Sequence, residues 1–430
     1  MTAARVLRRS GFGARGSEID YAVSLGDVSS FVNNMLGADF STDPGVVATP
    51  MPELDFLRRP QGSDNSERRR YAKKRTEQGR DLTHWWIQRM VEATNPTNEK
   101  LTFIWHNHFA TSMSKVRTAQ KMANQNQKLR ELCLLDFRRL AYAMLTDAAM
   151  ITWLDGHSNR VGSSNENLAR EFLELFALGH GNGYSERDVQ EGSRALTGWT
   201  LRNGVDAELL PRLHDKSSKS ILGTTGKIGA REFCDIVIAE PNSPRYIARS
   251  LWHQLASDEP PSDSTLERLT KAFGPDLDLR KLTSAILTDP AFLASSATVV
   301  TSPVDWIIGT LRAVQAPLRD GNKLNTVART LESLGQLPFH PPGVGGWPRG
   351  QAWLSSSAVN IRLRVASEIV GYGDVSLVAE SPIGERLDAA GYLIGVGEWS
   401  ERSAKALKPF RNDPTALVAA AINTPEYLTS

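Results

Sequence analysis

Cysteine is nearly absent from this sequence, which has two, Cys133 and Cys234, in a chain of 430 residues. The two lie far apart, inside apolar patterns typical of helices, and neither belongs to a spacing that binds a metal ion. So little cysteine excludes a small fold held together by disulfide bonds. We expect two buried thiols in a protein of a reducing compartment.

The chain also lacks an excess of charge of either sign. Fifty basic residues stand against 48 acidic ones, which gives a formal net charge of +2. Without a strong overall field, no nucleic-acid partner is expected. A local exception is the run 67–75, where six lysines and arginines fall in eight positions after Glu67. Such a run can bind a polyanion or can form a solvated helix face paired with Glu67 and Glu77, and both interpretations stay open.

Long hydrophobic runs are missing as well. No stretch reaches the ~18 apolar residues of a membrane-spanning helix, so no membrane span is predicted. The pair Arg8-Arg9 would suit a twin-arginine export signal, but polar residues occupy 13–18, where an apolar stretch of roughly 7–15 residues is required. The sequence itself therefore predicts a cytoplasmic protein.

Several catalytic signatures are absent from the sequence. It contains no nucleotide-binding glycine fingerprint, no serine nucleophile elbow and no cysteine in a nucleophile setting. Any chemistry must therefore come from clusters of histidine, acidic and basic side chains.

What the chain does contain is apolar residues at helical spacing over nearly its whole length, without convincing strand alternation. We predict an all-α, large multi-helix protein with long irregular loops near residues 200–227 and 338–356. A single domain over residues 1–430 is expected, with two lobes, 1–225 and 226–430. The expected helices are 17–36 with a break near Gly26, 82–94, 96–110, 116–146 with a break near Leu135, 165–179, 185–197, 229–240, 244–257, 263–273, 280–288, 303–316, 324–335, 357–371, 382–390, 401–407 and 413–424.

The most informative segment is 165–180. If it is helical, its leucines and phenylalanines share one broad stripe, and Glu171 falls within that stripe. An ionised carboxylate buried in such a place needs a cation, a metal ion or several hydrogen-bond donors. Glu174 and Asn167 lie three and four residues from Glu171, so these side chains can line one pocket wall. The sequence predicts a polar pocket beside Glu171.

Two interpretations of Glu171 stay open. Helical bundles hold divalent metal ions with carboxylates and imidazoles from facing helices, which makes Glu171 and Glu174 candidate metal ligands. Alternatively, Glu171 accepts hydrogen bonds from an arginine, such as Arg194 or Arg362, in a structural network. Arg170 lies four residues before Glu174 and is expected to pair with it.

Two histidines stand close together in the string Trp105-His106-Asn107-His108-Phe109. Residues two apart in a helix differ by ~200° in direction, so His106 and His108 face opposite sides and do not share one ion. Both are candidate metal ligands, and His106 is a candidate catalytic residue. The alternative is that each is a hydrogen-bonded core histidine among the neighbouring aromatic side chains.

A second His-containing pair, His214-Asp215, falls in an expected loop with Lys219. Loops that combine these side chains can transfer protons or bind ligands, so His214 and Asp215 are candidate catalytic residues.

The helix expected before this loop, 185–197, begins with Ser185 and Asp188 in the arrangement of a capping box. Arg194 lies on its charged ridge, and Trp199 follows it. We predict an amphipathic helix against which Trp199 packs.

A third irregular segment, 338–357, is rich in proline and glycine, which forbid a helix there. It presents Trp347, Trp353 and His340 from a loop inside a helical protein. This loop is either an aromatic wall for a ring-shaped substrate or a rigid plug that anchors the C-terminal helices.

Five separated segments can be compared with known families: 105–109, 165–179, 195–199, His214-Asp215 with Lys219 and Leu222-Gly223, and Gly346-Trp347-Pro348 with Trp353. Together they resemble the bacterial domain-of-unknown-function family numbered 1800, over nearly the whole chain, and 7–13 is similar to the family's usual opening. The resemblance implies no established activity. Members are often encoded beside a second family, numbered 1501, which looks sulfatase-like and is commonly exported, so the resemblance implies a protein partner and permits export together with it.

Two functions follow from these observations. The favoured one is a non-catalytic binding or maturation partner of a neighbouring protein. The alternative is a metal-assisted hydrolase or oxidoreductase, with a divalent metal ion held by Glu171 and Glu174 together with His106 or His108. In that enzyme, His214 or Asp215 would transfer protons. The residues expected to line its pocket are Asn167, Arg194, Trp199, Trp347 and Trp353.

Overall fold

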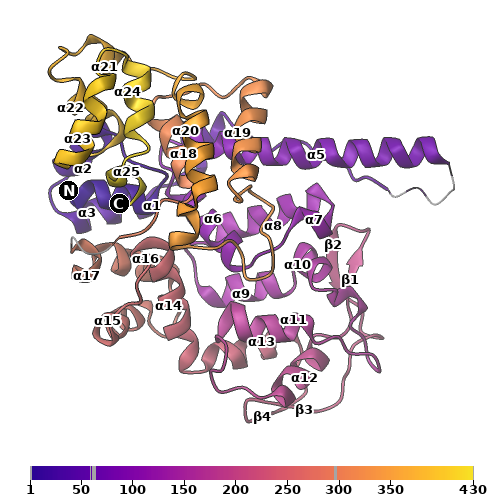
Figure 1. The fold of residues 1–430 in the computed structure, drawn as a ribbon. Coiled ribbons are helices and arrows are strands. Elements are labelled where there is room, and N and C mark those ends of the chain that lie inside the picture. Colours follow the sequence, from indigo (N-terminus) through magenta and orange to yellow (C-terminus); the bar gives the residue numbers. More distant parts are fainter. Residues whose placement is uncertain (1, 59, 61–63, 295–297, 430) are drawn as a thin grey trace.

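The computed structural model describes residues 2–58, 60, 64–294 and 298–429, and most of this part of the chain is helical, as predicted (Figure 1). The first helices are α1 (Thr2–Ser10), α2 (Gly16–Ser24), α3 (Val28–Gly37), α4 (Pro44–Val47), α5 (Asn65–Glu92), α6 (Thr97–His108) and α7 (Met113–Val116). They are followed by α8 (Ala119–Leu132), α9 (Phe137–Leu145), α10 (Ala148–Trp153), α11 (Asn167–Glu171), α12 (Glu186–Ala195), α13 (Ala230–Ala239), α14 (Asn242–Leu255), α15 (Asp263–Phe273), α16 (Leu279–Thr288) and α17 (Pro290–Leu293).

The C-terminal part of the chain, orange to yellow, forms the top of the molecule in Figure 1, above the magenta helices α9 to α13. α1 lies close to the last helix, because Arg8 Nη1 donates to the Glu426 carbonyl oxygen at 3.3 Å. The helices of this part are α18 (Pro303–Ala313), α19 (Gly321–Ser333), α20 (Ser356–Val370), α21 (Ser376–Glu380), α22 (Arg386–Ile394), α23 (Glu401–Leu407), α24 (Pro414–Ala421) and α25 (Pro425–Leu428).

Local sequence explains where many of these helices begin. The capping box predicted at Ser185 and Asp188 is confirmed at the start of α12. Asp147 and Asp289 are simple N-caps of α10 and α17, because the side chain of each accepts a hydrogen bond from a backbone N–H of the first turn. Such side-chain caps satisfy N–H groups that have no partner inside the helix.

The prediction of an irregular loop near residues 200–227 is wrong in part, because this segment contains two antiparallel hairpins. The first pairs β1 (Trp199–Arg202) with β2 (Asp206–Leu209), and the second pairs β3 (Lys219–Ile221) with β4 (Thr224–Gly226). Strands of three or four residues are too short for apolar alternation to be visible in the sequence. The second predicted loop, 338–356, is irregular apart from a 3₁₀ turn over Gly350–Leu354.

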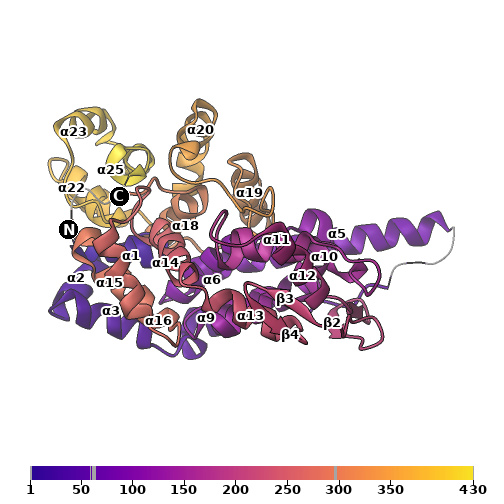
Figure 2. The ribbon, with the colours of Figure 1, turned by 90° about the horizontal axis from the view of Figure 1, so that it is seen from below.

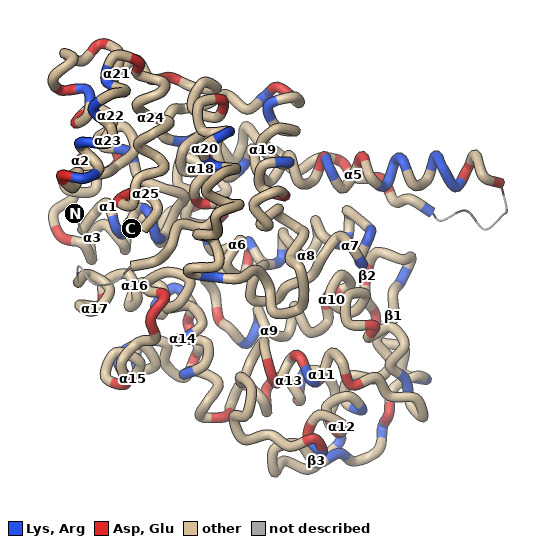
Figure 3. Tube along the Cα trace, viewed as in Figure 1, with Lys and Arg blue, Asp and Glu red and all other residues tan. Residues whose placement is uncertain are grey.

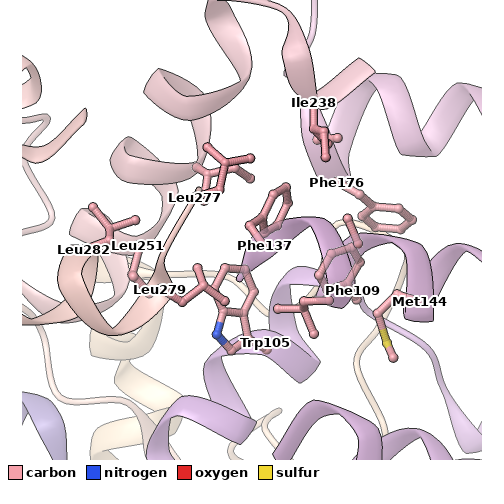
Figure 4. Packing of buried hydrophobic residues seen from close by; sticks show 14 of the residues in the cluster. Trp105, Phe109, Phe137, Met144, Phe176, Ile238, Leu251, Leu277, Leu279 and Leu282 are labelled. Carbon is pink, nitrogen blue, oxygen red and sulfur yellow. The ribbon is translucent and has the colours of Figure 1, made fainter. Parts of the chain in front are cut away.

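Buried apolar residues form two clusters, and α6 contributes to both. Trp105 and Phe109 belong to the first cluster, where they pack with Phe137 and Phe176 (Figure 4). Phe103 belongs to the second cluster, which also contains residues from α5 and from α18 to α24. Every residue from 97 to 106 in α6 is buried. α6 is therefore a central helix, enclosed on all sides.

The long helix α5 has two halves with different surroundings. Its buried residues begin at Gly79, and the half before Gly79 projects beyond the rest of the fold in both views (Figures 1 and 2). The sequence predicted only 82–94 as a helix here, because the projecting half has no apolar stripe. Among the described residues, no helix is long and apolar enough to cross a membrane.

The inner half of α5 is fastened to α6 by a buried ionic network that the sequence analysis missed. Glu99 is 1% exposed and accepts hydrogen bonds from Arg89 Nε at 2.7 Å, Arg130 Nε at 2.8 Å and Trp86 Nε1 at 2.9 Å. Burial alone would raise the pKa of Glu99, but Arg130 and Arg89 outweigh burial and lower the pKa to about 2. Glu99 therefore stays ionised in the interior.

Candidate functional site

The segment that carries Glu171 is helical, but it does not bury the carboxylate as predicted. α11 ends at Glu171 and continues directly into a π-helical segment, Phe172–Ala177. Glu171 is half-buried, and the pKa of its carboxyl is raised by this burial and by Glu174, with Arg170 opposing. The helix is covered on less of its circumference than the apolar stripe indicated, so the side chain reaches the surface.

The predicted pairing of Arg170 with Glu174 is confirmed, at 3.5 Å. Arg170 also pairs with Glu166 at 3.0 Å and with Glu186 at 2.7 Å. Asn167, expected in the same pocket wall as Glu171, is exposed. This group of acidic side chains therefore lies at the molecular surface around one arginine.

The two arginines considered as partners of Glu171 bind other groups. Arg194 pairs with Asp215, and Arg362 donates to the carbonyl oxygens of Trp353 and Thr301. The prediction that Arg194 or Arg362 donates hydrogen bonds to Glu171 is therefore wrong.

His106 is enclosed by aromatic rings, with 1% of its surface exposed. The ring centroids of Trp86, Phe339 and Trp347 lie 5.5, 5.5 and 5.6 Å from its own. Burial, and then the neighbouring His340, lower the pKa of His106 to about 3, so the ring is neutral. Its Nε2 has no hydrogen-bond partner among the described residues.

His108 lies on the other side of α6, as the helical spacing predicted. Its Nε2 is 2.8 Å from the carbonyl oxygen of Phe176 and its Nδ1 is 3.3 Å from Ser250 Oγ. Because a carbonyl only accepts, Nε2 carries the proton and Nδ1 accepts from the serine. Burial lowers the pKa of His108 to about 4, with the Phe176 hydrogen bond opposing. Both ring nitrogens are thus used within the protein.

The histidines and carboxylates chosen as metal ligands do not assemble into one centre. His106 packs against α5 and the loop around Phe339, whereas His108 contacts the π-helical segment that follows Glu171. Across the ranges that the structure describes, no group of three or more histidine, cysteine or acidic side chains could hold a metal ion. The predicted metal site therefore has no support from this geometry.

The pair His214-Asp215 belongs to a separate network against the end of α12. Arg194 Nε donates to Asp215 Oδ2 at 2.8 Å, and His214 Nδ1 lies 2.9 Å from the Thr197 carbonyl oxygen. The Arg194 hydrogen bond holds the pKa of Asp215 far below its usual range, although burial opposes it. Lys219, 1% exposed, donates to the Asp215 carbonyl oxygen at 2.6 Å. Asp215 remains ionised, and its hydrogen bond with Arg194 attaches the loop that carries His214 to α12.

Two glycines explain how this loop and helix approach their neighbours. Gly198 has φ +90°, and a Cβ there would lie 2.9 Å from the His214 backbone nitrogen. A Cβ on Gly192 would meet Phe233 Cε2 at 2.8 Å. Trp199, expected to pack against α12, is half-buried and begins β1 opposite Leu209.

The loop at 338–356 was expected to be either an aromatic wall for a ligand or a rigid plug that anchors helices. Both of its tryptophans are buried, which favours the plug. Trp347 is 3% exposed and stacks on Phe103 with ring centroids 5.1 Å apart. Its backbone N–H donates to Asn107 Oδ1 at 2.7 Å. Gly346 has φ +79°, and a Cβ there would lie 2.5 Å from the Asn107 carbonyl oxygen. The prediction of an open aromatic wall is wrong for Trp347 and Trp353, which is 5% exposed.

A cleft of about 730 Å³, which the sequence analysis did not identify, lies between α5, α7 and α19. We call it the basic cleft. Two close contacts join the elements that line this cleft. α5 lies so close to α7 that a Cβ on Gly79 would be 2.9 Å from Met113 Cε. The backbone N–H of Met113 donates to the Phe339 carbonyl oxygen at 2.9 Å. Its charged and imidazole lining residues are Arg75, Arg80, His84, Arg117, Arg329, Glu332 and His340.

Four arginines against one glutamate make this lining strongly cationic. Arg80 lies 3.3 Å from Asp81 in an exposed pair, and Arg117 Nε donates to the Ser114 carbonyl oxygen at 3.1 Å. Burial, and then Arg80, lower the pKa of His84. A concave surface with one sign of charge concentrates ligands of the opposite sign. The sequence could not reveal this cleft, because its arginines are spread from residue 75 to residue 329.

Comparison with known proteins gives one match. The model of a family described as "Protein of unknown function (DUF1800)" matches residues 5–429. Neither the curated proteins nor the solved structures gave a match to this chain.

Proposed function

Because this chain belongs to the DUF1800 family, whose function is unknown, we propose a role from its own surface: it is a non-catalytic binding or maturation partner of a neighbouring protein. The proposed partner belongs to the companion family numbered 1501, which the sequence resemblance implied. The partner contributes an acidic surface, and this chain contributes a basic one. Export of the two as a complex belongs to the same proposal.

The observation that carries this proposal is the projecting half of α5, residues 65–78, which we call the basic arm. Six lysines and arginines lie between residues 68 and 75, and at ~100° per residue they point to all sides of the helix. Two ion pairs within the arm are long and exposed, 4.0 Å for Arg70 with Glu67 and 3.8 Å for Lys73 with Glu77. Blue bands dominate this part of α5 in Figure 3.

A helix without an apolar stripe gains little from packing on its own protein. The basic arm therefore presents a mostly exposed, charged surface to another molecule. The basic surface continues into the basic cleft at its foot, because Arg75 belongs to both. Charge complementarity of this kind speeds association and selects the partner.

We predict that charge reversal on the basic arm weakens the complex. With Arg69, Arg70, Lys73 and Lys74 changed to Glu, recovery of the co-expressed partner should fall roughly tenfold or more, because the steering charges are inverted. The complex of the wild-type protein should dissociate at roughly 1 M salt, where the Debye length is about 3 Å. Affinity purification after nuclease treatment, with quantitation of both chains, measures the effect.

The matched control carries the same charge change elsewhere on the surface. Arg402, Lys405, Lys408 and Arg411 are exposed in and after α23, and their change to Glu should leave recovery of the partner unaffected. Failure of the wild-type pair to copurify at low salt, or equal losses in both variants, would contradict the proposal.

A metal-assisted hydrolase or oxidoreductase is the second candidate, and one observation favours it. The π-helical segment directly follows Glu171, and single π-helical turns occur often at functional sites. The raised pKa of Glu171 suits a carboxyl group that exchanges a proton. Glu174 is the second carboxylate available there.

We predict that elemental mass spectrometry of the purified, untagged protein separates the two candidates. The partner role expects no stoichiometric metal ion in the wild-type protein or in Glu171→Gln, with the fold intact in both, because Glu174, the second carboxylate, already pairs with Arg170. One metal ion per wild-type chain that is lost in Glu171→Gln would instead favour the enzyme. Glu53→Gln, at an exposed position, controls for nonspecific metal binding.

A further inference from the structure

The end of α1 and the turn that follows it, residues 9–12, are buried, and the proposed partner role does not explain why a charged residue lies there. After α1, the backbone turns through Gly11-Phe12-Gly13 and presses against α18. A Cβ on Gly13 would lie 3.0 Å from Gly309 Cα, and a Cβ on Gly309 would lie 2.8 Å from the Phe12 carbonyl oxygen. This close approach carries the last turn of α1, with Arg8 and Arg9, into the interior.

Arg8 and Arg9 meet Lys100 around a cavity of about 40 Å³. Arg9 is 4% exposed and Lys100 is 6% exposed. The other polar residues of the lining are Gln254, Thr301, Asp305 and Tyr427. Three cationic side chains thus converge on one small cavity from α1 and α6, and α18 and α25 contribute Asp305 and Tyr427.

The charge of Arg8 is not balanced by a carboxylate in the described lining of this cavity. Asp305, the one carboxylate among the described lining residues, forms a salt bridge with Lys100. Arg8 donates to the carbonyl oxygens of Gly395 and Glu426, which carry no net charge, and its Nε is buried without a hydrogen-bond partner among the described residues. A buried cation such as Arg8, whose hydrogen bonds reach only neutral carbonyl oxygens, is costly.

Burial and cationic neighbours both disfavour the charged form of Arg9. Burial, followed by Arg5 and Arg8, lowers the pKa of Arg9 to about 9, and Asp258 and Asp305, which raise this pKa, do not offset the lowering. An anion in the cavity would favour the charged form of all three cationic side chains.

We propose that Arg8, Arg9 and Lys100 form a binding site for one small inorganic oxyanion, phosphate or sulfate. Guanidinium groups present planar pairs of N–H donors that match the oxygens of such anions. A cavity of about 40 Å³ exceeds the ~10–15 Å³ that one water needs. The site lies apart from the basic arm and does not depend on the proposed partner.

Equilibrium dialysis of the full-length protein with radiolabelled sulfate tests this site. We expect saturable binding of one sulfate per chain, displaced by unlabelled phosphate and not by an equal concentration of chloride. Arg9→Gln should weaken binding roughly tenfold to a hundredfold, because a charged hydrogen bond to the anion is lost. Arg402→Gln, on the exposed surface of α23, should bind as the wild type does.

A second variant moves binding in the opposite direction. Asp305→Asn removes the negative charge from the lining while keeping a similar shape, so sulfate should bind more tightly than in the wild-type protein. Misfolding cannot produce this gain. The proposal is overturned if the wild-type protein binds no sulfate saturably, if chloride displaces it equally well, or if Asp305→Asn fails to strengthen binding.

Discussion

Glu99→Ala should destabilise the protein by about 3–5 kcal/mol, because it leaves Arg89 and Arg130 buried without their shared carboxylate. The side chain of Trp86 would also lose its acceptor. Thermal and denaturant-induced unfolding, followed by circular dichroism, measure the loss. Glu53→Ala, at an exposed position, is the control and should change stability by less than about 0.5 kcal/mol.

The ionised carboxylate of Glu99 should also make the stability of the protein depend on pH in the acidic range. The pKa of Glu99 is lowered in the folded protein from 4.5 to about 2, so its contribution is fully present above pH 4.5 and is lost as the pH falls through about 2. The Glu99→Gln variant has no carboxyl group to titrate at this position. Its free energy of unfolding should therefore fall less steeply than that of the wild type between pH 4.5 and about 2. Parallel pH profiles for the wild type and Glu99→Gln would show that the network does not hold an ionised carboxylate.

Trp347→Ala should cost about 3–5 kcal/mol, the range for removing a large buried aromatic side chain. It would leave a void against Phe103 and His106 and release the loop from α6. The midpoint of thermal unfolding should fall accordingly. An aromatic wall in an open cleft would instead lose ligand binding with little change in stability, so an unchanged midpoint contradicts the role of Trp347 as a plug.

Leu354→Ala provides the comparison within the same loop. Leu354 is 39% exposed, so its truncation removes little buried area and should cost well under the amount for Trp347. Equal effects of the two substitutions would mean that the loop responds to any change and not to loss of the buried ring.

Much of the helical framework was predictable because helix-forming patterns are local. The ranges 263–273 and 401–407 coincide with α15 and α23. The opposite directions of His106 and His108 also follow from the helix repeat alone. The short hairpins between Trp199 and Gly226 were missed because three or four residues do not establish a period.

The candidate site was predictable only as a set of separate segments. Arg194 and Asp215 come together through the fold of the loop against α12, and Trp347 reaches His106 across more than half of the chain. No local pattern records such pairings, because they depend on how whole helices are arranged. The basic cleft illustrates the same limit, since its arginines share no segment.

Glu171 and Glu99 differ in burial, a property that depends on the tertiary structure and not on the local sequence. By itself, the sequence determined that both residues lie in helices and that Glu171 falls on the apolar stripe of its helix. It could not determine how much of each helix is covered by neighbours. α11 is covered on part of its circumference, so Glu171 reaches the surface, whereas α6 is enclosed on all sides and buries Glu99. A helix enclosed on all sides has no polar face, and therefore no periodic pattern marks its two buried charges, Glu99 and Lys100.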